Sequence, residues 1–234
     1  MEGTPDFKIK VVIPASGMGT RLGGEMPKQF LDICGEPILK HTLQVFDSCS
    51  FVDEISVAVP EEYIEEVRGY GLSRVTHIVA GMSQRANSVY AALEALQPFE
   101  GVVLVHDGIR IFVTEDLIRS VANAAYEHGA AVAGVPVIET VKKVDESGLV
   151  ISTPDRRRLW LAQTPQGFRY NLLVNAYSRA AADGVLEHAT DDSSLIERLG
   201  HSVRMVQGDL LNMKITSMMD YKLAQALSKD KWVS

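Results

Sequence analysis

Short apolar runs, each followed by a segment with helical spacing, recur along most of the chain. Residues 10–15 (KVVIPA) form a run typical of a strand that is buried on both faces. Similar runs predict further strands at residues 55–59, 76–80, 102–106 and 130–137.

Helices are predicted between these strands. Residues 38–46 carry apolar side chains at helical spacing, and Pro37 suits a first helical turn. Residues 61–70 and 83–96 have similar patterns, and Thr114 is expected to cap a helix that starts with two acidic residues. This alternation predicts an α/β fold with a doubly wound, mainly parallel sheet, in which ligands bind beyond the carboxyl ends of the strands.

Residues 138–157 break the alternation. Two short alternating runs, residues 140–144 and 149–152, flank the sequence DESG, which favours a turn. We therefore expect a β-hairpin that projects from the domain as an arm. Because a lone hairpin is marginally stable in water, the arm should pack on something, and folding back on its own domain is one possibility.

A helix, a strand and a C-terminal helix over residues 217–227 are expected after the arm. The sequence shows no repeats and no clear linker. We interpret residues 1–234 as a single domain with one projecting arm.

Composition narrows the function classes. The chain has 234 residues, 46% of them hydrophobic, with a net charge of −7 and a pI near 5.4. This acidic balance argues against general binding to nucleic acid or to a membrane surface. Cys34 and Cys49 lack C-x-x-C spacing, which disfavours a zinc site and fits a reducing compartment. With no apolar leader or membrane-spanning run in view, we expect a soluble, cytoplasmic protein.

The most informative segment is the glycine-rich loop after the first strand, residues 14–30 (PASGMGTRLGGEMPKQF). Glycines let backbone N–H groups approach a phosphate closely, and Arg21 and Lys28 add positive charge. The loop lacks the Gly-Lys-Ser/Thr of a Walker motif. It also departs from the dinucleotide fingerprint, because Leu22 stands where the third glycine is needed. The alternative is a tight turn with solvated charges.

This segment resembles the nucleotide-binding signature of sugar- and polyol-phosphate nucleotidyltransferases. The whole chain resembles the 2-C-methyl-D-erythritol 4-phosphate cytidylyltransferase family of non-mevalonate isoprenoid biosynthesis. The likeness follows the family's order in residues 14–30, 81–89, 106–110, 159–168, 190–192 and 212–216. It implies a Rossmann-like nucleotidyltransferase fold and transfer of CMP from CTP to a polyol phosphate, with release of pyrophosphate.

Such a reaction needs cations more than a base. A phosphate monoester has a second pKa of about 6 and is mostly dianionic at neutral pH. The obstacle is the approach of one anion to another, so cations directed at the phosphates are the main catalytic equipment. We therefore expect Arg21, Lys28 and Lys214 to be catalytic. Lys214 stands in an apolar, strand-like run, residues 210–215, where a lysine needs either an edge position or an anion.

Asp107 is the candidate metal ligand. It follows a buried strand and points to the rim, where a carboxylate can hold Mg²⁺ that bridges polyphosphate oxygens. The alternative is a turn or helix cap, and the resemblance favours the metal. Asp209 is a weaker second carboxylate, and His106 is expected to pack and to form hydrogen bonds.

The resemblance also implies a nucleotide pocket. Ser16, Met82 and Ser83 depart from the residues usual in the family, so the cytosine edge is expected to be recognised by backbone groups of this pocket. Ser88 is expected either to contact the base or to pack at the helix start. The expected nucleotide-binding residues are Pro14, Ala15, Ser16, Gly17, Gly19, Thr20, Gly81, Met82, Ser83, Arg85, Ser88 and Asp107.

The second substrate needs its own anion site. The resemblance implies that the arm packs on the same arm of a second subunit. Thr140 and Arg156, which fall on the arm, are therefore expected to serve the neighbouring subunit of a homodimer, although residues 156–158 also suit a cationic interface. Ile111 replaces a proline usual in the family, and Asp192 is expected to orient cations of the site. The residues that the resemblance assigns to the polyol phosphate are Arg110, Thr140, Arg156, Thr190 and Lys214.

Other functions remain open from the sequence. Ribitol-5-phosphate cytidylyltransferase is the nearest rival, and residues 159–166 favour the isoprenoid enzyme. A non-catalytic nucleotide-binding module is disfavoured because Arg21, Lys28, Asp107 and Lys214 occur together. The glycine spacing disfavours an NAD-dependent oxidoreductase.

Overall fold

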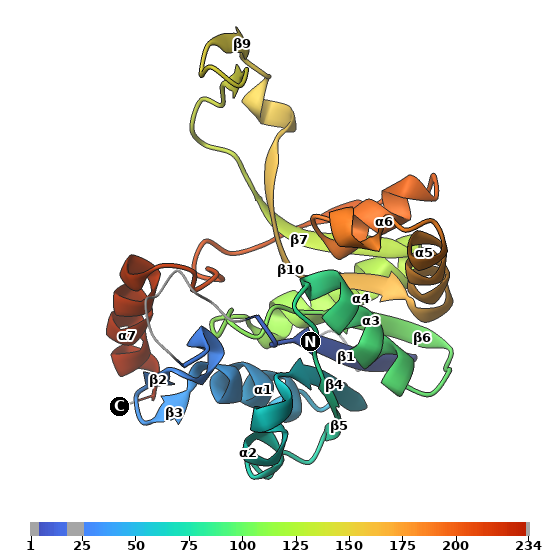
Figure 1. Ribbon diagram of the computed structural model, residues 1–234, viewed down its shortest axis with the longest axis vertical. Coiled ribbons are helices and arrows are strands. Elements are labelled where there is room, and N and C mark those ends of the chain that lie inside the picture. Colours follow the sequence, from blue (N-terminus) through green and yellow to red (C-terminus); the bar gives the residue numbers. More distant parts are fainter. Residues whose placement is uncertain (1–4, 18–25, 233–234) are drawn as a thin grey trace.

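The core of the fold is one mainly parallel sheet, seen in a computed structural model that describes residues 5–17 and 26–232 (Figure 1). β10 runs antiparallel to both of its neighbours, and the other pairings are parallel. Within the described residues the strands lie in the spatial order β11 (Arg204–Gln207), β7 (Ala130–Pro136), β10 (Trp160–Arg169), β6 (Gly101–Val105), β1 (Lys8–Pro14), β4 (Glu54–Val59) and β5 (Val75–Ala80).

Helices cover both faces of the sheet. Alternate residues of β1 point to opposite faces, so Ile9 and Val11 join one apolar cluster while Val12 joins the other. The first cluster includes α1, α2 and α4, and the second includes α3, α5 and α6. These helices, with the C-terminal one, are α1 (Ile38–Ser48), α2 (Ile64–Arg68), α3 (Arg85–Ala95), α4 (Glu115–His128), α5 (Tyr170–Ala182), α6 (Asp192–Arg198) and α7 (Met218–Trp232).

The predicted doubly wound α/β fold is confirmed, with some changes to its elements. The helix expected over residues 83–96 starts later, at Arg85, and α7 extends beyond the predicted residues 217–227. Residues 61–70 divide into a 3-10 turn (Glu61–Tyr63) and α2. Thr114 caps α4 as expected, since its side chain accepts a hydrogen bond from the backbone N–H of Leu117.

Two expectations after the arm are wrong. The long strand β10 was not predicted, because its sequence carries glutamines, a proline and a glycine rather than an apolar run. Residues 210–215 are not a strand but a turn followed by irregular backbone. The hydrogen bond from Ile215 N–H to the Ile109 carbonyl instead holds this segment beside the loop after β6.

The arm leaves the body of the molecule between β7 and β10 (Figure 1). The predicted hairpin is present, with shorter strands, as the antiparallel pair β8 (Lys143–Val144) and β9 (Val150–Ser152). In its turn the Asp145 carboxylate accepts hydrogen bonds from the N–H groups of Ser147 and Leu149. Leu149, Val150 and Ile151 are each more than half exposed.

A third, smaller apolar cluster joins α7 to the loop after β6. Ile111, which stands where a proline was expected, is fully buried there and contributes to the packing with Ala224 of α7. Ile33 adds the small hairpin β2 (Asp32–Ile33) and β3 (Glu36–Pro37) to the same cluster. Across residues 5–17 and 26–232, no helix combines the length and the apolar character that crossing a membrane requires.

Candidate functional site

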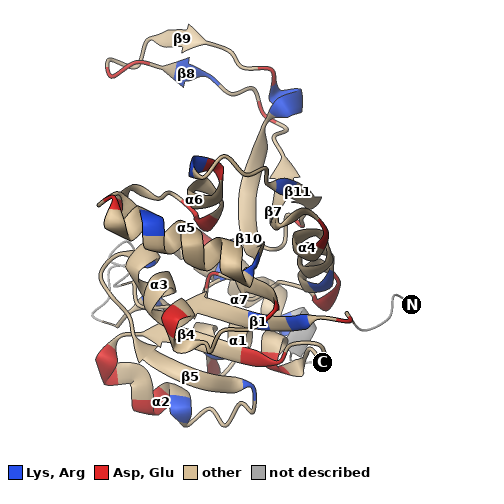
Figure 2. Cartoon of the chain, turned by 90° about the vertical axis from the view of Figure 1, so that its right-hand side faces the viewer, with Lys and Arg blue, Asp and Glu red and all other residues tan. Residues whose placement is uncertain are grey.

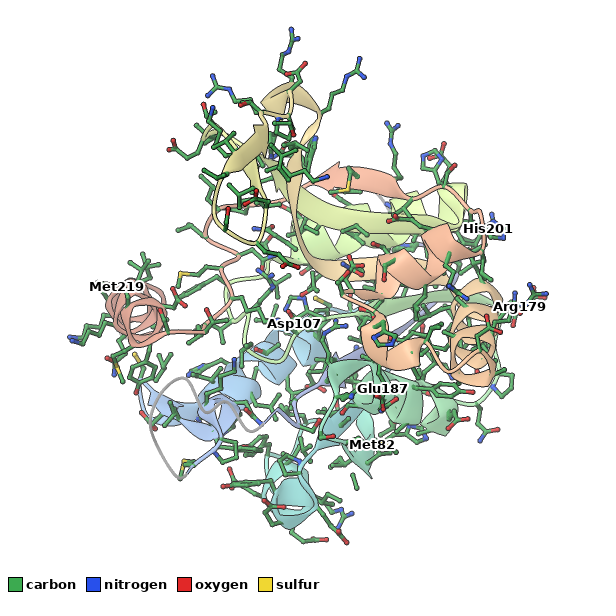
Figure 3. The ribbon with its side chains drawn as sticks, turned by 45° about the horizontal axis from the view of Figure 1, so that its top comes forward. Met82, Asp107, Arg179, Glu187, His201 and Met219 are labelled. Carbon is green, nitrogen blue, oxygen red and sulfur yellow. The ribbon has the colours of Figure 1, made fainter. Side chains whose placement is uncertain are left out.

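The loops that follow β1, β5 and β6 converge at the carboxyl edge of the sheet. The Ala15 N–H donates to the Ala58 carbonyl at 2.7 Å, and the Gly81 N–H donates to the Val59 carbonyl at 2.7 Å. Asp107, which follows β6, lies near the middle of the molecule among the side chains of these loops (Figure 3). Sequence segments far apart are therefore brought to one rim, as the parallel sheet predicts.

A pocket of about 190 Å³ opens at this rim. Its wall includes Lys28 of the 3-10 helix Lys28–Phe30, which is held in place because the Gln29 side chain donates to the Ala15 carbonyl at 2.6 Å. Arg21, Gly19 and Thr20 lie outside the described residues. The predicted residues that line the pocket are Pro14, Ala15, Ser16, Gly17, Lys28, Met82, Ser83, Arg85, Asp107 and Lys214.

Gly81 and Ser88 support this pocket from behind. The Ser16 and Ser88 hydroxyl oxygens lie 2.6 Å apart, and the Ser88 hydroxyl accepts the Met82 N–H at 2.9 Å. A Cβ at Gly81 would lie 2.2 Å from the Ser16 Cβ, so only glycine fits beside this serine. The fully buried Ser88 therefore fixes the backbone of the pocket wall.

A second pocket of about 280 Å³ adjoins the first. Arg110 and Thr190, both expected to bind the polyol phosphate, line it together with Gln163, Thr164 and Gln166. The two pockets share three lining residues: Arg85, Asp107 and Lys214.

Asp107 of this shared wall contacts three cations, of which Arg85 and Lys214 line both pockets and Arg110 lines the second. Its carboxylate lies 3.0 Å from Arg85 Nε, 2.9 Å from Lys214 Nζ and 3.5 Å from Arg110 Nε. Burial alone would raise the pKa of Asp107, but the three cations hold it well below its usual value. Lys214 thus has the anion that its apolar surroundings required, and the carboxylate stays ionised between the two pockets.

Comparison with known proteins agrees with this arrangement. The model of the IspD family, 2-C-methyl-D-erythritol 4-phosphate cytidylyltransferase, matches residues 9–230. The chain belongs to this family. It is thus a cytidylyltransferase, which is a kind of nucleotidyltransferase.

Individual relatives cover nearly the full length of the chain. The chain is 47% identical to the 2-C-methyl-D-erythritol 4-phosphate cytidylyltransferase of Geotalea uraniireducens, over 95% of this chain and 97% of the relative. The enzyme of the same name from Symbiobacterium thermophilum is 43% identical, over 95% and 94%. The crystal structure of the Thermus thermophilus enzyme of that name matches with a TM-score of 0.78 and 35% identity, over 94% and 98%.

His106 stabilises the loop that carries Asp107 and Arg110 in this member of the IspD family. The Arg110 carbonyl can only accept, so His106 Nε2, 3.1 Å away, carries the ring proton and donates to it. In the neutral ring Nδ1 then accepts from the Thr164 hydroxyl at 3.1 Å, and that hydroxyl accepts the Asp107 N–H at 3.0 Å. The prediction that His106 has a packing and hydrogen-bonding role is confirmed.

Because His106 is neutral in the folded protein, we expect the protein to lose folding stability in acid. Burial lowers the pKa of His106 to about 4, against an ordinary value of 6.5. Because the unfolded chain takes up the proton first, stability is lost as the pH falls from about 6.5 towards 4. We expect about 2 kcal/mol of unfolding free energy to be lost through His106 between pH 7 and 4.5. Urea denaturation at both pH values should show that His106→Asn loses less unfolding free energy between pH 7 and 4.5 than the unmodified protein does. Equal losses in the two proteins would contradict the prediction.

The arm residues lie apart from the pockets of their own chain. Neither Thr140 nor Arg156 lines either pocket. Arg156 belongs to the 3-10 helix Arg156–Arg158, a basic segment of the arm (Figure 2), and it donates to the Ile138 carbonyl at 2.6 Å. The Asp209 carboxylate also lines neither pocket, because it accepts the N–H of Leu211 in a local turn.

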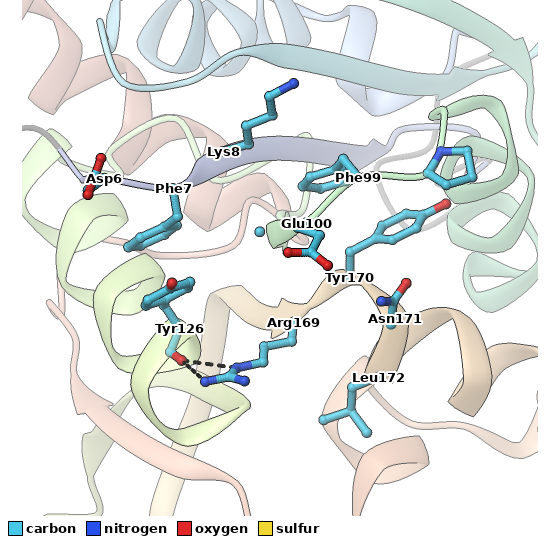
Figure 4. A pocket seen from close by; sticks show the side chains of 12 residues that line it. Asp6, Phe7, Lys8, Phe99, Glu100, Tyr126, Arg169, Tyr170, Asn171 and Leu172 are labelled. Carbon is cyan, nitrogen blue, oxygen red and sulfur yellow. Dashed lines mark hydrogen bonds between the residues drawn. The ribbon is translucent and has the colours of Figure 1, made fainter.

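A cavity of about 830 Å³ lies at the opposite edge of the sheet, and Figure 4 shows the side chains that line it. Phe7 and Lys8 at the start of β1 and Gly101 at the start of β6 contribute to it. Arg169 there donates to the Tyr126 carbonyl, and the Tyr126 ring stacks on Phe7. Ligands of doubly wound sheets bind beyond the carboxyl ends of the strands, whereas this cavity lies at the amino ends of β1 and β6.

Several site residues have no signal in the sequence that would assign them a role. Gln29 was part of a recognised motif, but its bond to Ala15 depends on the tertiary fold. Tyr177 lies in the apolar pattern of α5, yet its hydroxyl reaches a carboxylate of α6. Such contacts join residues that spacing along the chain does not relate.

Proposed function

We propose that this chain transfers CMP from CTP to 2-C-methyl-D-erythritol 4-phosphate, with release of pyrophosphate, in non-mevalonate isoprenoid biosynthesis. The observation that carries the proposal is the pair of adjoining pockets whose shared wall is formed by Arg85, Asp107 and Lys214. One pocket has the start of the glycine loop, residues 14–17, and Lys28 for CTP. The other has Arg110 and Thr190 for the polyol phosphate.

The reaction joins two anions. A phosphate oxygen of the polyol phosphate attacks the α-phosphorus of CTP, and a new O–P bond forms. The bond from this phosphorus to the oxygen that bridges to the β-phosphate breaks, and its electron pair leaves with pyrophosphate. Lys28 and Lys214 line the nucleotide pocket, and their charges offset the repulsion and stabilise the leaving group. We assign the same role to Arg21.

Magnesium is proposed as the cofactor, with Asp107 as its protein ligand. Within residues 5–17 and 26–232 no group of three or more His, Cys, Asp or Glu side chains is arranged to hold a metal. A single ionised carboxylate nevertheless fits Mg²⁺, which commonly uses one or two carboxylates together with substrate phosphates and water. When bound, the metal would withdraw charge from the phosphates, while Arg85 and Lys214 keep the carboxylate ionised.

We further propose a cytoplasmic homodimer that forms through the arm. Ile138, Leu149, Val150 and Ile151 are between 58% and 69% exposed, more than a short isolated hairpin is expected to leave in water. A second copy of the arm would cover these side chains and would carry Thr140 and Arg156 towards the partner's second pocket. The exposed, unpaired Cys34 suits a reducing compartment.

Arg156→Ala tests the assignment of the arm. We expect the KM for the polyol phosphate to rise about tenfold, which is one lost charge-assisted contact, while the KM for CTP changes little. Initial rates with each substrate varied in turn would measure both constants. Arg157, which pairs with Asp155 on the same turn, offers a control in Arg157→Ala. Equal changes in both KM values would contradict the assignment of Arg156.

A pyrophosphate-release screen tests the proposed function directly. The purified chain with Mg²⁺ is given each of CTP, UTP, ATP and GTP with either methylerythritol phosphate or ribitol phosphate. We expect release with CTP and methylerythritol phosphate. Preference for ribitol phosphate would replace the proposed substrate, and CTP binding without any release would indicate a non-catalytic module.

A further inference from the structure

A buried chain of polar contacts connects α5 and α6 to the shared wall of the two pockets. Arg85 Nη2 lies 2.8 Å from Asp192 Oδ2, and Arg85 Nε lies 3.0 Å from Asp107 Oδ1. The other oxygen of Asp192 accepts the Tyr177 hydroxyl at 2.5 Å. A single guanidinium therefore joins a site carboxylate to one that lines neither pocket.

Hydrogen bonds to the Gln166 side chain hold the backbone at Asp192 in place, and they do not involve Arg85. The Gln166 side chain of β10 accepts the N–H groups of Asp192 and Ser193, and its amide donates to Asp191. The start of α6 is thereby attached to the central sheet. Asp192 is fully buried, so its carboxylate has little freedom to move.

Burying the Asp192 carboxylate costs solvation energy, and its ion pair with Arg85 offsets that cost. A buried ion pair is often no more stabilising than apolar side chains of similar volume, and its best-attested use is to specify geometry. Burial disfavours the charged form of Arg85, yet the carboxylates of Asp192 and Asp107 raise its pKa well above the usual value. The two carboxylates contact different nitrogens of the planar guanidinium, which sets its orientation as well as its place.

We propose that Asp192 is a positioning residue, supported by Tyr177, that fixes the guanidinium of Arg85 between the nucleotide pocket and the polyol phosphate pocket. Arg85 lines both pockets and its side chain is 30% exposed, so it can reach phosphate oxygens while it remains held from behind. The proposal rests on the reaction proposed above. It adds that a residue outside both pockets holds one of the cations used in that reaction.

The Asp192→Asn variant distinguishes a role in positioning Arg85 from a simple effect of the negative charge of Asp192. The amide is nearly isosteric and can still accept from Arg85 and donate to Tyr177, so the fold should be retained. Loss of a negative charge beside an anion site would by itself tighten anion binding. Positioning predicts the opposite: inorganic pyrophosphate, measured by calorimetry, should bind about fivefold more weakly, and kcat should fall about 30-fold. Pyrophosphate binding that is unchanged or tighter would overturn the proposal.

Variants of Arg85 and Tyr177 test the same positioning role from the two other ends of the contact chain. Arg85→Lys cannot contact both carboxylates with one planar group, and its kcat loss should not add to that of Asp192→Asn in the double variant. Additive losses would overturn the proposal. Tyr177→Phe should reproduce the weaker pyrophosphate binding at about threefold, and it replaces Asp192→Asn if that variant does not fold. Asp183→Asn, which loses an exposed ion pair with Arg198, is the matched control.

The two proposals fail in different ways. An unmodified enzyme without turnover contradicts the proposed reaction, and the calorimetry with pyrophosphate still decides the role of Asp192, because that measurement needs no turnover. Normal turnover in Asp192→Asn refutes the positioning role and leaves the reaction standing.

Discussion

Lys28→Ala is expected to lower kcat about 100-fold, equivalent to roughly 3 kcal/mol of transition-state stabilisation, while the fold is retained. Lys28 lines the pocket proposed for CTP, and the Gln29 bond to Ala15 attaches its 3-10 helix to the residue after β1. The backbone that carries Lys28 is thus held in place before substrate arrives. Because charge on the leaving pyrophosphate grows in the transition state, kcat should suffer more than the KM for CTP.

Steady-state rates and thermal unfolding of the variant would check this prediction. Lys222→Ala removes the same charge from an exposed position on α7 that lines neither pocket, and its kcat should match that of the unmodified enzyme. A Lys28→Ala variant with nearly normal kcat would show that Lys28 is only a solvated loop charge.

Most residues of the pocket proposed for CTP could be predicted because they lie in a few short motifs. The glycine loop, Lys28 and the segment around Ser88 each follow a strand, and parallel strands place such segments at one edge. The same logic placed Asp107 at the rim. These inferences need only the order of the elements and the chemistry of each motif.

The links between motifs were not predictable from spacing. Arg85 at the start of α3 and Asp192 at the start of α6 are 107 positions apart, and their ion pair forms in a sheet where β10 lies between β7 and β6. β10 itself was missed because its sequence carries Pro165, two glutamines and a glycine rather than an apolar run, and the structure shows an irregular register between Ala162 and Gln166. That irregularity accompanies the inward placement of Thr164, whose hydroxyl contacts both Asp107 and His106.

Asp107→Asn has the second large expected effect, because one carboxylate neutralises three cations. Without it, Arg85, Arg110 and Lys214 repel one another in a largely buried space. Loss of one partner from a buried charge network costs about 3 kcal/mol of folding stability. We expect that loss in urea denaturation, together with a fall in kcat of at least about 100-fold, as the cations leave their positions and the proposed metal loses its ligand.

The dependence of the rate on Mg²⁺ concentration distinguishes the two proposed roles of Asp107, as a metal ligand and as the residue that positions three cations. If the carboxylate holds Mg²⁺, the residual activity of Asp107→Asn should need a much higher Mg²⁺ concentration for half of its maximal rate. If it only positions Arg85, Arg110 and Lys214, that concentration should stay the same while kcat falls. Glu65→Gln, which breaks an exposed ion pair with Arg68, controls for the loss of one negative charge and should leave both quantities unchanged. A stable, active Asp107→Asn variant would contradict both roles, since neither a metal ligand nor a centre for three cations can be lost without effect.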